Sequence, residues 1–469
     1  MRGRDALFPD FTELDAEENA LTARLKDVRR KYATRKAAGE TLSPEWLNDL
    51  HGMHFNQPEN LGTLMDWVIE ALDKGGVQMT HPGYLGLFNP SPTFASECAD
   101  RIASAFNPQI CVYSHAPAAV EIEQHVINEV AHRAGLPEGS GGHFTSGGAE
   151  ANSASVLCAL QAKCPKYSDK GVGEFSGQPT VYVSKESHLA WLKMAHAAGI
   201  GRDAVRLVST DGNGRMDMEA LETAINTDLT AGLVPVLIVA TAGTTNAGMI
   251  DPLNPCADLA NQHKMWFHVD AAWGGALIAS DKDRDVLAGM ERADSITIDA
   301  HKWFATTMGA GMFLTSRVDI PAQVFRVAAS YMPESEASKD YYLNSTQWSR
   351  RFVGLRLFLA LGAAGWKGYE EHVTGTIRLT DRLTDRLKQA GWVHANNSPL
   401  GVSCMVPPEG HQAVQHYVDA VLEDGRFWIS KAVFEDRPVL RACVTNGRTD
   451  EATIDTLAEM LCNLSIMVD

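Results

Sequence analysis

Two residues with complementary chemistry follow separate apolar runs in the middle of the chain. Asp270 ends the run in MWFHVDAAW, and Lys302 comes 32 residues later, after the run in SITIDAHKW. Open α/β sheets bind ligands where their strands end. Next to His301, Trp303 and Phe304, the lysine would lose hydration, which favours a neutral, nucleophilic amine. Taken alone, such a pair is more often a surface lysine and a helix-capping aspartate.

A third element offers a place for an anion. In HFTSGGAEANSASVLCAL, a glycine-rich turn runs directly into a predicted helix. Backbone N–H groups at the start of a helix attract anions, and glycine allows a ligand to come close. The residues that provide these groups are Ser146, Gly147, Gly148 and Ala149. By itself a turn of this kind is usually a simple connection.

Together, the lysine, the aspartate and the turn match the needs of one cofactor. An aldehyde forms a Schiff base with a lysine amine, and a pyridine ring that takes up electrons needs a carboxylate at its nitrogen. A phosphate group needs an anion site. We therefore expect pyridoxal 5'-phosphate, with its aldehyde on Lys302 and its ring nitrogen at Asp270.

The elements that must position these residues alternate along the chain. From residue 76 to 355, short apolar runs such as TVYVS, VRLVS and SITIDA are separated by amphipathic stretches. This pattern predicts a mainly parallel sheet covered by helices on both faces, with VPVLIVA as a central strand. The predicted domains are an N-terminal helical segment (1–75), a cofactor-binding large domain (76–355) and a small C-terminal α/β domain (356–469).

Composition narrows the class of protein. The chain has 469 residues and a net charge of −17, with no Lys/Arg run that could follow a phosphate backbone, so nucleic acid and acidic membranes are poor partners. Eight scattered cysteines, a start without a signal-peptide core and no membrane-length apolar window predict a cytoplasmic protein. His263 and His268 would face opposite sides of a strand, so we expect no metal site.

The motifs HVDAAWGG and DAHKW, together with the glycine-rich turn, closely resemble the group II pyridoxal-phosphate decarboxylases. This family includes the aromatic amino acid, glutamate and cysteine sulfinate decarboxylases, and the resemblance covers roughly residues 60 to 469. It implies an aspartate-aminotransferase-like fold with a seven-stranded sheet. It also implies loss of the α-carboxylate of an amino acid, and an obligate homodimer with active sites at the subunit interface.

The resemblance gives further residues a role. It implies that His188 stacks on the cofactor ring, that Thr245 offers a hydroxyl on the cofactor side and that Ala272 packs under the ring. It places His301 near the phosphate or substrate, and Arg441 at a substrate carboxylate. From the residues alone, these positions are equally well explained by helix starts, loop caps, core packing or a salt bridge.

One position departs from part of the family. Several animal members have Asn near the cofactor phosphate, where this chain has Asp299, although bacterial-type members often resemble this chain there. A carboxylate beside a phosphate dianion would be repelled unless it is protonated or turned away. A role for Asp299 in binding the phosphate is therefore left open.

Residues 331–349, YMPESEASKDYYLNSTQWS, have few apolar anchors and are typical of a mobile surface loop. The resemblance implies that this loop closes over the active site of the neighbouring subunit and brings a tyrosine to protonate the substrate α-carbon. Counting back from Arg350-Arg351 places that tyrosine at Tyr341, with Tyr342 as second choice. A tyrosine rather than a phenylalanine favours plain decarboxylation over aldehyde formation.

The substrate is the least determined feature. By the resemblance, Tyr113 occupies a pocket position where relatives of both aromatic and acidic preference carry an aromatic ring. Phe88 and Trp273 would line a pocket that accepts an aromatic side chain, and we find no second Arg or Lys clearly placed for a side-chain carboxylate. We therefore expect an aromatic amino acid, with an acidic amino acid as the alternative. A transaminase or another lyase on the same fold, and a silent homologue that acts as a binding or dimer-forming protein, also stay open.

Overall fold

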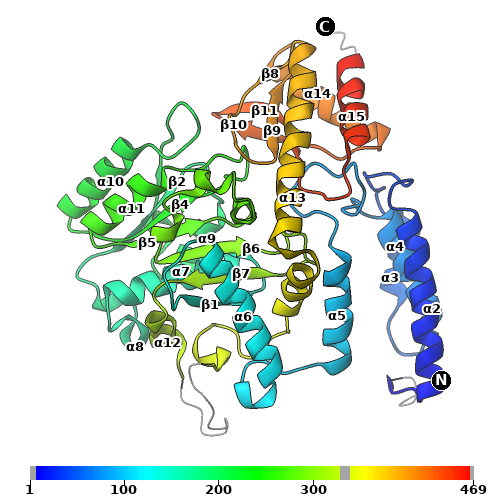
Figure 1. The fold of residues 1–469 in the computed structure, drawn as a ribbon, viewed down its shortest axis with the longest axis horizontal. Helices are drawn as coiled ribbons and strands as arrows, with labels where there is room; N and C mark the ends of the chain where they lie inside the picture. The colour runs from blue at the N-terminus through cyan, green and yellow to red at the C-terminus, as the bar shows by residue number, and fades with distance from the viewer. Residues whose placement is uncertain (1–6, 328–338, 465–469) are drawn as a thin grey trace.

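The computed structural model describes residues 7–327 and 339–464. Figure 1 shows a large body built around one sheet, a smaller sheet next to it, and three N-terminal helices along one flank. The predicted α/β class with a seven-stranded sheet and a small C-terminal α/β part is confirmed.

The large sheet has the order β1-β7-β6-β5-β4-β2-β3. All neighbours pair in parallel except β7, which runs antiparallel to both β1 and β6. The mainly parallel sheet that we predicted is therefore correct. Its strands are β1 (Gly141–Thr145), β2 (Pro179–Ser184), β3 (Val205–Val208), β4 (Val234–Thr241), β5 (Trp266–Asp270), β6 (Ser295–Asp299) and β7 (Gly311–Thr315).

Alternate residues of the central strands pack into two separate apolar cores. In β4, Leu237 and Val239 face one core while Ile238 and Ala240 face the other, because successive strand side chains point to opposite faces. This two-sided burial explains the continuous apolar run in the sequence.

Helices cover both faces of the sheet. Those of one face are α7 (Gly148–Lys163), α9 (Ala190–Ala197) and α12 (Asp319–Phe325). Those of the other are α6 (Pro117–Arg133), α10 (Met218–Thr230), α11 (Leu253–Gln262) and the first part of α13 (Gly354–Gln389). Two further helices, α5 (Phe94–Phe106) and α8 (Tyr167–Lys170), lie at the periphery.

The second sheet is antiparallel, with the order β10-β11-β9-β8. The long helix α13 joins it to the large body, since its start packs in the large core and its end packs in the core of the small sheet. The boundary predicted at residue 355 falls at the start of this helix. The elements here are β8 (Val393–His394), β9 (Val402–Val406), β10 (Ser430–Phe434), β11 (Arg437–Cys443), α14 (Val414–Asp424) and α15 (Glu451–Asn463).

The N-terminal helices α2 (Phe11–Arg30), α3 (Pro44–Gly52) and α4 (Leu61–Lys74) pack mainly on one another (Figure 1). The Trp46 and Trp67 rings stack at 3.9 Å, and Arg24 pairs with Asp66. None of the three helices contains a buried residue. In residues 7–327 and 339–464, no helix is both long and apolar enough to cross a membrane.

Candidate active site

Lys302 lies in the turn that follows β6. Its ammonium Nζ is 3.0 Å from Oδ2 of Asp299, the last residue of that strand. The lysine side chain is 24% exposed, whereas the neighbouring Trp303 and Phe304 are fully buried. The amine is thus held by a carboxylate beside an apolar wall, and a ligand can still reach it.

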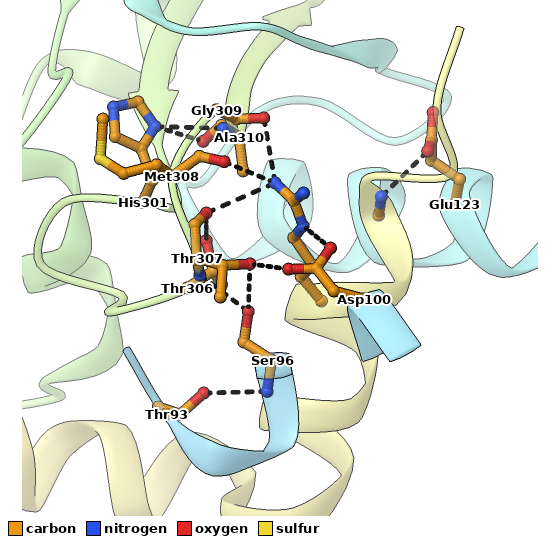
Figure 2. Close-up of polar contacts among 12 residues, drawn as sticks. Thr93, Ser96, Asp100, Glu123, His301, Thr306, Thr307, Met308, Gly309 and Ala310 are labelled. Carbon is orange, nitrogen blue, oxygen red and sulfur yellow. Dashed lines mark hydrogen bonds and ion pairs between the residues drawn. The ribbon is translucent and has the colours of Figure 1, made fainter. Parts of the chain in front are cut away.

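A polar network fixes loop 306–310, which leads from the lysine turn to β7 (Figure 2). Arg356 of α13 donates to carbonyl oxygens of this loop at 2.8 and 3.2 Å. The Arg356 Nε donates to one carboxylate oxygen of Asp100 at 2.7 Å, and Thr307 donates to the other at 2.6 Å. Helices α5 and α13 therefore fix the loop through the side chains of Asp100 and Arg356.

The same loop sets the orientation of His301. Its ring Nδ1 is 3.2 Å from the N–H of Ala310 and 3.0 Å from the carbonyl oxygen of that residue (Figure 2). The other ring nitrogen, Nε2, lies 4.0 Å from Asp299. A Cβ added to Gly147 would lie 3.6 Å from the ring, so His301 packs against the predicted anion turn.

Asp270 closes β5 and is 5% exposed. Its Oδ2 accepts a hydrogen bond of 2.8 Å from the Asn152 side chain in the first turns of α7, and its Oδ1 accepts from the N–H of Ala272 at 3.2 Å. The register of β5 on β6 puts Asp270 opposite Thr297, two residues before Asp299. The carboxylate and the lysine therefore end neighbouring strands at one edge of the sheet.

Behind Asp270, buried hydrogen bonds continue through the protein in one direction. Because Asn152 donates to Asp270, its amide oxygen faces His268, 3.1 Å away, and must accept from the His268 Nε2–H. A neutral His268 then accepts at Nδ1 from the Ser295 hydroxyl at 2.8 Å. That hydroxyl in turn accepts from the Trp266 Nε1–H at 2.8 Å. We call Trp266, Ser295, His268 and Asn152 the Asp270 relay.

Sequence reasoning missed the Asp270 relay, although part of its signal was present. His268 precedes Asp270 by two residues in a strand, and this spacing puts both side chains on one face. Asn152 stands on a helix more than a hundred residues away, and nothing in the sequence pattern pairs it with the strand.

Residues 146–149 join β1 to α7, as predicted, but two carboxylates already face this turn. Glu150 accepts from both the N–H and the hydroxyl of Ser146, at 2.8 and 2.6 Å. A Cβ on Gly148 would lie 2.9 Å from Asp299, so this glycine is needed for the close approach. The Asp299 Oδ1 is buried and has no hydrogen-bond partner among the described residues.

The other residues assigned to the cofactor lie at the same edge of the sheet. His188 follows β2 and is exposed; its Nδ1 accepts from the N–H of Ala190 at 3.1 Å, close to the start of α9. Thr245 follows β4, and Ala272 follows β5; both are partly exposed. The structure therefore brings His188, Thr245 and Ala272 to the strand ends that carry Asp270 and Lys302.

Phe88, Trp273 and Arg441 pack together next to this edge, and each is no more than 5% exposed. The Phe88 ring stacks on Trp273 at 4.3 Å, and Trp273 contacts the Trp303 ring at 5.5 Å. The Arg441 guanidinium lies 5.7 Å from the Phe88 ring centre. It donates to the Ser430 hydroxyl and to carbonyl oxygens of residues 245 and 86, at 3.0, 2.6 and 2.8 Å.

The structure does not bring Tyr341 and Tyr113 together with Lys302. The Tyr341 ring is 3% exposed and lies 4.2 Å from the guanidinium carbon of Arg350, and burial raises the pKa of its phenol well above the usual range. Tyr113 packs in the same cluster, and Tyr342 contacts Trp348 at 5.1 Å. Residues 331–338 of the predicted loop lie outside the described residues.

Within residues 7–327 and 339–464, no group of three or more His, Cys, Asp or Glu side chains is arranged to hold a metal ion. The polar residues at the strand ends are instead an amine, a carboxylate and a helix start. This combination suits an organic cofactor with an aldehyde, a basic ring nitrogen and a phosphate.

A pH-dependent stability follows from the burial of His268. Burial lowers its pKa to about 4, below the ordinary value of 6.5, so acid protonates the unfolded chain first and stability falls as the pH drops from 6.5 through 4. Between pH 7 and 5, wild type should lose about 2 kcal/mol more free energy of unfolding than His268→Gln. Urea titrations at both pH values measure this difference. An equal loss in both proteins would contradict it, and the exposed His416→Gln serves as control.

The sequence of this chain is similar to those of known proteins. A family model described as the pyridoxal-dependent decarboxylase conserved domain matches residues 45–398. An aromatic-L-amino-acid decarboxylase of Bacillus atrophaeus is 28% identical over 403 residues, which are 83% of this chain and 82% of that protein. The acidic amino acid decarboxylase GADL1 of Bos taurus is 32% identical over 355 residues, 71% of this chain and 67% of that protein.

Solved structures of similar proteins have the same fold as this chain. The apo form of mouse CSAD superposes with a TM-score of 0.90 at 25% identity, over 96% of this chain and 98% of that one. Oryza sativa TDC with PLP and tryptamine superposes with a TM-score of 0.91 at 21% identity, over 97% and 98%. Because the family model spans most of the sequence, the chain belongs to the pyridoxal-dependent decarboxylase family.

Proposed function

We propose that this chain, a pyridoxal-phosphate-dependent amino acid decarboxylase, acts on an aromatic amino acid. The observation that carries the proposal is the stacked pair of Phe88 and Trp273, which extends through Trp303 to the turn of Lys302. Aromatic rings favour offset stacking on one another, so such a wall suits an aromatic side chain.

Arg441 supports the same substrate class. A guanidinium has five N–H donors, and three of those on Arg441, which is 4% exposed, are bound to protein oxygens, so at most two remain for a ligand. Two donors suit one bidentate carboxylate. The second carboxylate of an acidic amino acid would then face the rings of Phe88 and Trp273 without a partner, at a desolvation cost.

Acidic amino acids are the alternative substrates, because relatives with that activity are as similar in sequence as the aromatic ones. A silent binding or dimer-forming homologue is less well supported. Lys302, Asp270 and the glycine turn of residues 146–149 are all present, and the structure brings all three to one sheet edge.

Pyridoxal phosphate, when bound, supplies an aldehyde that condenses with amines and a ring that accepts the electron pair left by a departing carboxylate. The residues present fit this group. Lys302 offers the amine, and Asp270 stabilises a proton on the ring nitrogen while Asn152 holds the carboxylate in place. The start of α7 receives the phosphate once Glu150 releases the N–H of Ser146.

Four residues complete the cofactor site in this proposal. In it, His188 and Ala272 would contact the cofactor ring, and Thr245 and His301 would provide further contacts to the cofactor. Asp299 holds the Lys302 ammonium at 3.0 Å, which keeps that amine near the aldehyde position.

A substrate screen tests the proposed reaction. Carbon dioxide release from Trp, Tyr, Phe, Glu, Asp and cysteine sulfinate is measured with purified holoenzyme and no keto acid. We expect the aromatic acids to react with kcat/KM at least about tenfold above the acidic ones, and Lys302→Ala to lose roughly 100-fold or more. Faster turnover of an acidic amino acid would overturn the substrate class, and turnover that requires a keto acid would indicate transamination.

We further propose that a tyrosine of loop 331–349 returns a proton to the substrate α-carbon, with Tyr341 as the assigned donor. In the described position its ring is held by Arg350 and the buried Glu123, which lies 2.6 Å from Arg350. The donor role therefore requires residues 339–343 to leave this packing. The loop contains a third tyrosine, Tyr331, outside the described residues.

Single Tyr-to-Phe substitutions at positions 331, 341 and 342 test this assignment. The Tyr341 hydroxyl has no hydrogen-bond partner in the described part of the chain, so Tyr341→Phe should keep the wild-type melting temperature. We expect it to lower kcat by about 10²-fold or more, since a positioned proton donor contributes that much. Loss of activity in Tyr331→Phe or Tyr342→Phe alone would move the role to that residue.

A homodimer with shared active sites is the proposed assembly. The N-terminal helices and the loop that joins α3 to α4 expose large apolar side chains, with Phe11 at 85%, Phe55 at 91% and Leu72 at 70% exposure. Apolar surface of this extent is unusual for a monomer and marks an interface.

We also propose a cytoplasmic location, since all eight cysteines are free thiols.

Sedimentation velocity tests the dimer. Wild type should sediment as a dimer, and Phe55→Asp/Leu72→Asp should shift it towards the monomer and lower activity, because two buried charges oppose apolar burial. The matched control is Leu207→Asp/Leu229→Asp, which changes two exposed leucines of the large domain. A variant that stays dimeric would place the interface elsewhere.

A further inference from the structure

A cavity of about 550 Å³ opens at the edge of the large sheet opposite the proposed active site. It lies between the end of α7 and helix α11, and its floor includes the early residues of β4 and β5. The active-site residues follow the carboxyl ends of the same strands. The two sites share no residue, so this cavity is separate from the decarboxylation chemistry.

The floor of the cavity is apolar and buried. Ala159, Val236, Ala260 and Trp266 are each no more than 4% exposed, and Phe267 and Met265 also contribute. Ligand pockets of this volume are usually lined mainly by apolar and aromatic groups, with a few polar groups that fix orientation. Because these floor side chains are almost completely covered, the polar residues of the rim provide most of the surface that a ligand can reach.

The rim carries four cations, Lys163, Lys264, Arg292 and Arg317, and one carboxylate, Asp294. This is unexpected in a chain with a net charge of −17. Two of the cations have carboxylate partners, since Arg292 pairs with Asp258 at 2.6 Å and Arg317 with Asp294 at 3.6 Å. A local excess of positive charge remains at the rim.

That excess is centred on the two lysines. In the described residues neither Lys163 nor Lys264 has a carboxylate within ion-pair distance, and the Lys163 ammonium donates only to the carbonyl oxygens of residues 263 and 264, at 3.5 and 3.0 Å. Burial and the neighbouring Lys264 lower the pKa of Lys163, so its charged form is disfavoured where it stands. A bound anion would relieve both effects.

We propose that this cavity binds a small organic anion whose carboxylate or phosphate head lies between Lys163 and Lys264. Two ammonium groups beside a buried apolar floor select an anion over a neutral molecule of the same shape. They also exclude amines, the chemical class that decarboxylation releases.

Equilibrium dialysis of the holoenzyme tests the site with three probes that share one ring: 2-naphthoate, 2-naphthyl phosphate and the neutral 2-naphthamide. We expect at least one anion to bind at least about tenfold more tightly than the amide, and added salt to weaken that binding. The preferred head distinguishes a carboxylate ligand from a phosphate ligand. Equal binding of all three probes would overturn the proposal.

Variants locate the binding. Lys163→Gln/Lys264→Asn should weaken anion binding by about tenfold or more, whereas Lys166→Gln/Lys170→Gln, which removes two exposed lysines at the two ends of α8, should not. Lys264 has a φ of 51°, a conformation that Asn tolerates, so Lys264→Asn alone is a variant that folds and should weaken binding by roughly threefold. Unchanged affinity in these variants would place the anion elsewhere, for example in the active site, and would refute the proposal.

Discussion

The buried carboxylate of Asp270 is the constraint on which the rest of the site depends. Burying a polar side chain that is only 5% exposed is costly unless it is hydrogen-bonded, and the chain meets this need with the Asn152 amide and the N–H of Ala272. Because Asn152 is fixed by His268, the carboxylate cannot rotate without breaking several buried bonds. The side chain is thus fixed at the end of β5, next to the strand that leads to Lys302.

A second constraint is the crowding of negative charge at the start of α7. Asp299 neutralises the Lys302 ammonium, and Glu150 occupies the Ser146 donors, so the helix N-terminus already interacts with carboxylates. The positive end of a helix stabilises either a carboxylate or a phosphate. Gly148 allows Asp299 to approach, and a side chain there would collide with it. The N–H and hydroxyl of Ser146 are therefore already bound to a group of the protein itself.

The sequence predicted the fold, and it placed Asp270 and Lys302 after neighbouring strands, because strands and helices leave local signals. Apolar runs that alternate with amphipathic stretches reveal strands and helices, and Asp270 and Lys302 each directly follow such a run. Contacts between distant segments leave no such signal. Asn152 donates to Asp270, which is 118 residues away in the sequence. Arg356, which holds the loop after the lysine, pairs with Asp100, which is 256 residues away. The placement of Tyr341 relied on a count within a polar loop, where no periodicity fixes the register.

Strand β5 links the two edges of the sheet. Its sequence WFHVD alternates, so Trp266, His268 and Asp270 share one face while Phe267 and Val269 pack in the opposite core. On the first face, Trp266 lines the cavity between α7 and α11, and Asp270 lies at the proposed cofactor site. His268 lies between them in the Asp270 relay. Polar groups in the middle of a sheet are costly unless each is paired, and here each pairs with the next. The free-energy cost of burying these polar groups is thus offset only if every hydrogen bond from Trp266 to Asp270 stays intact.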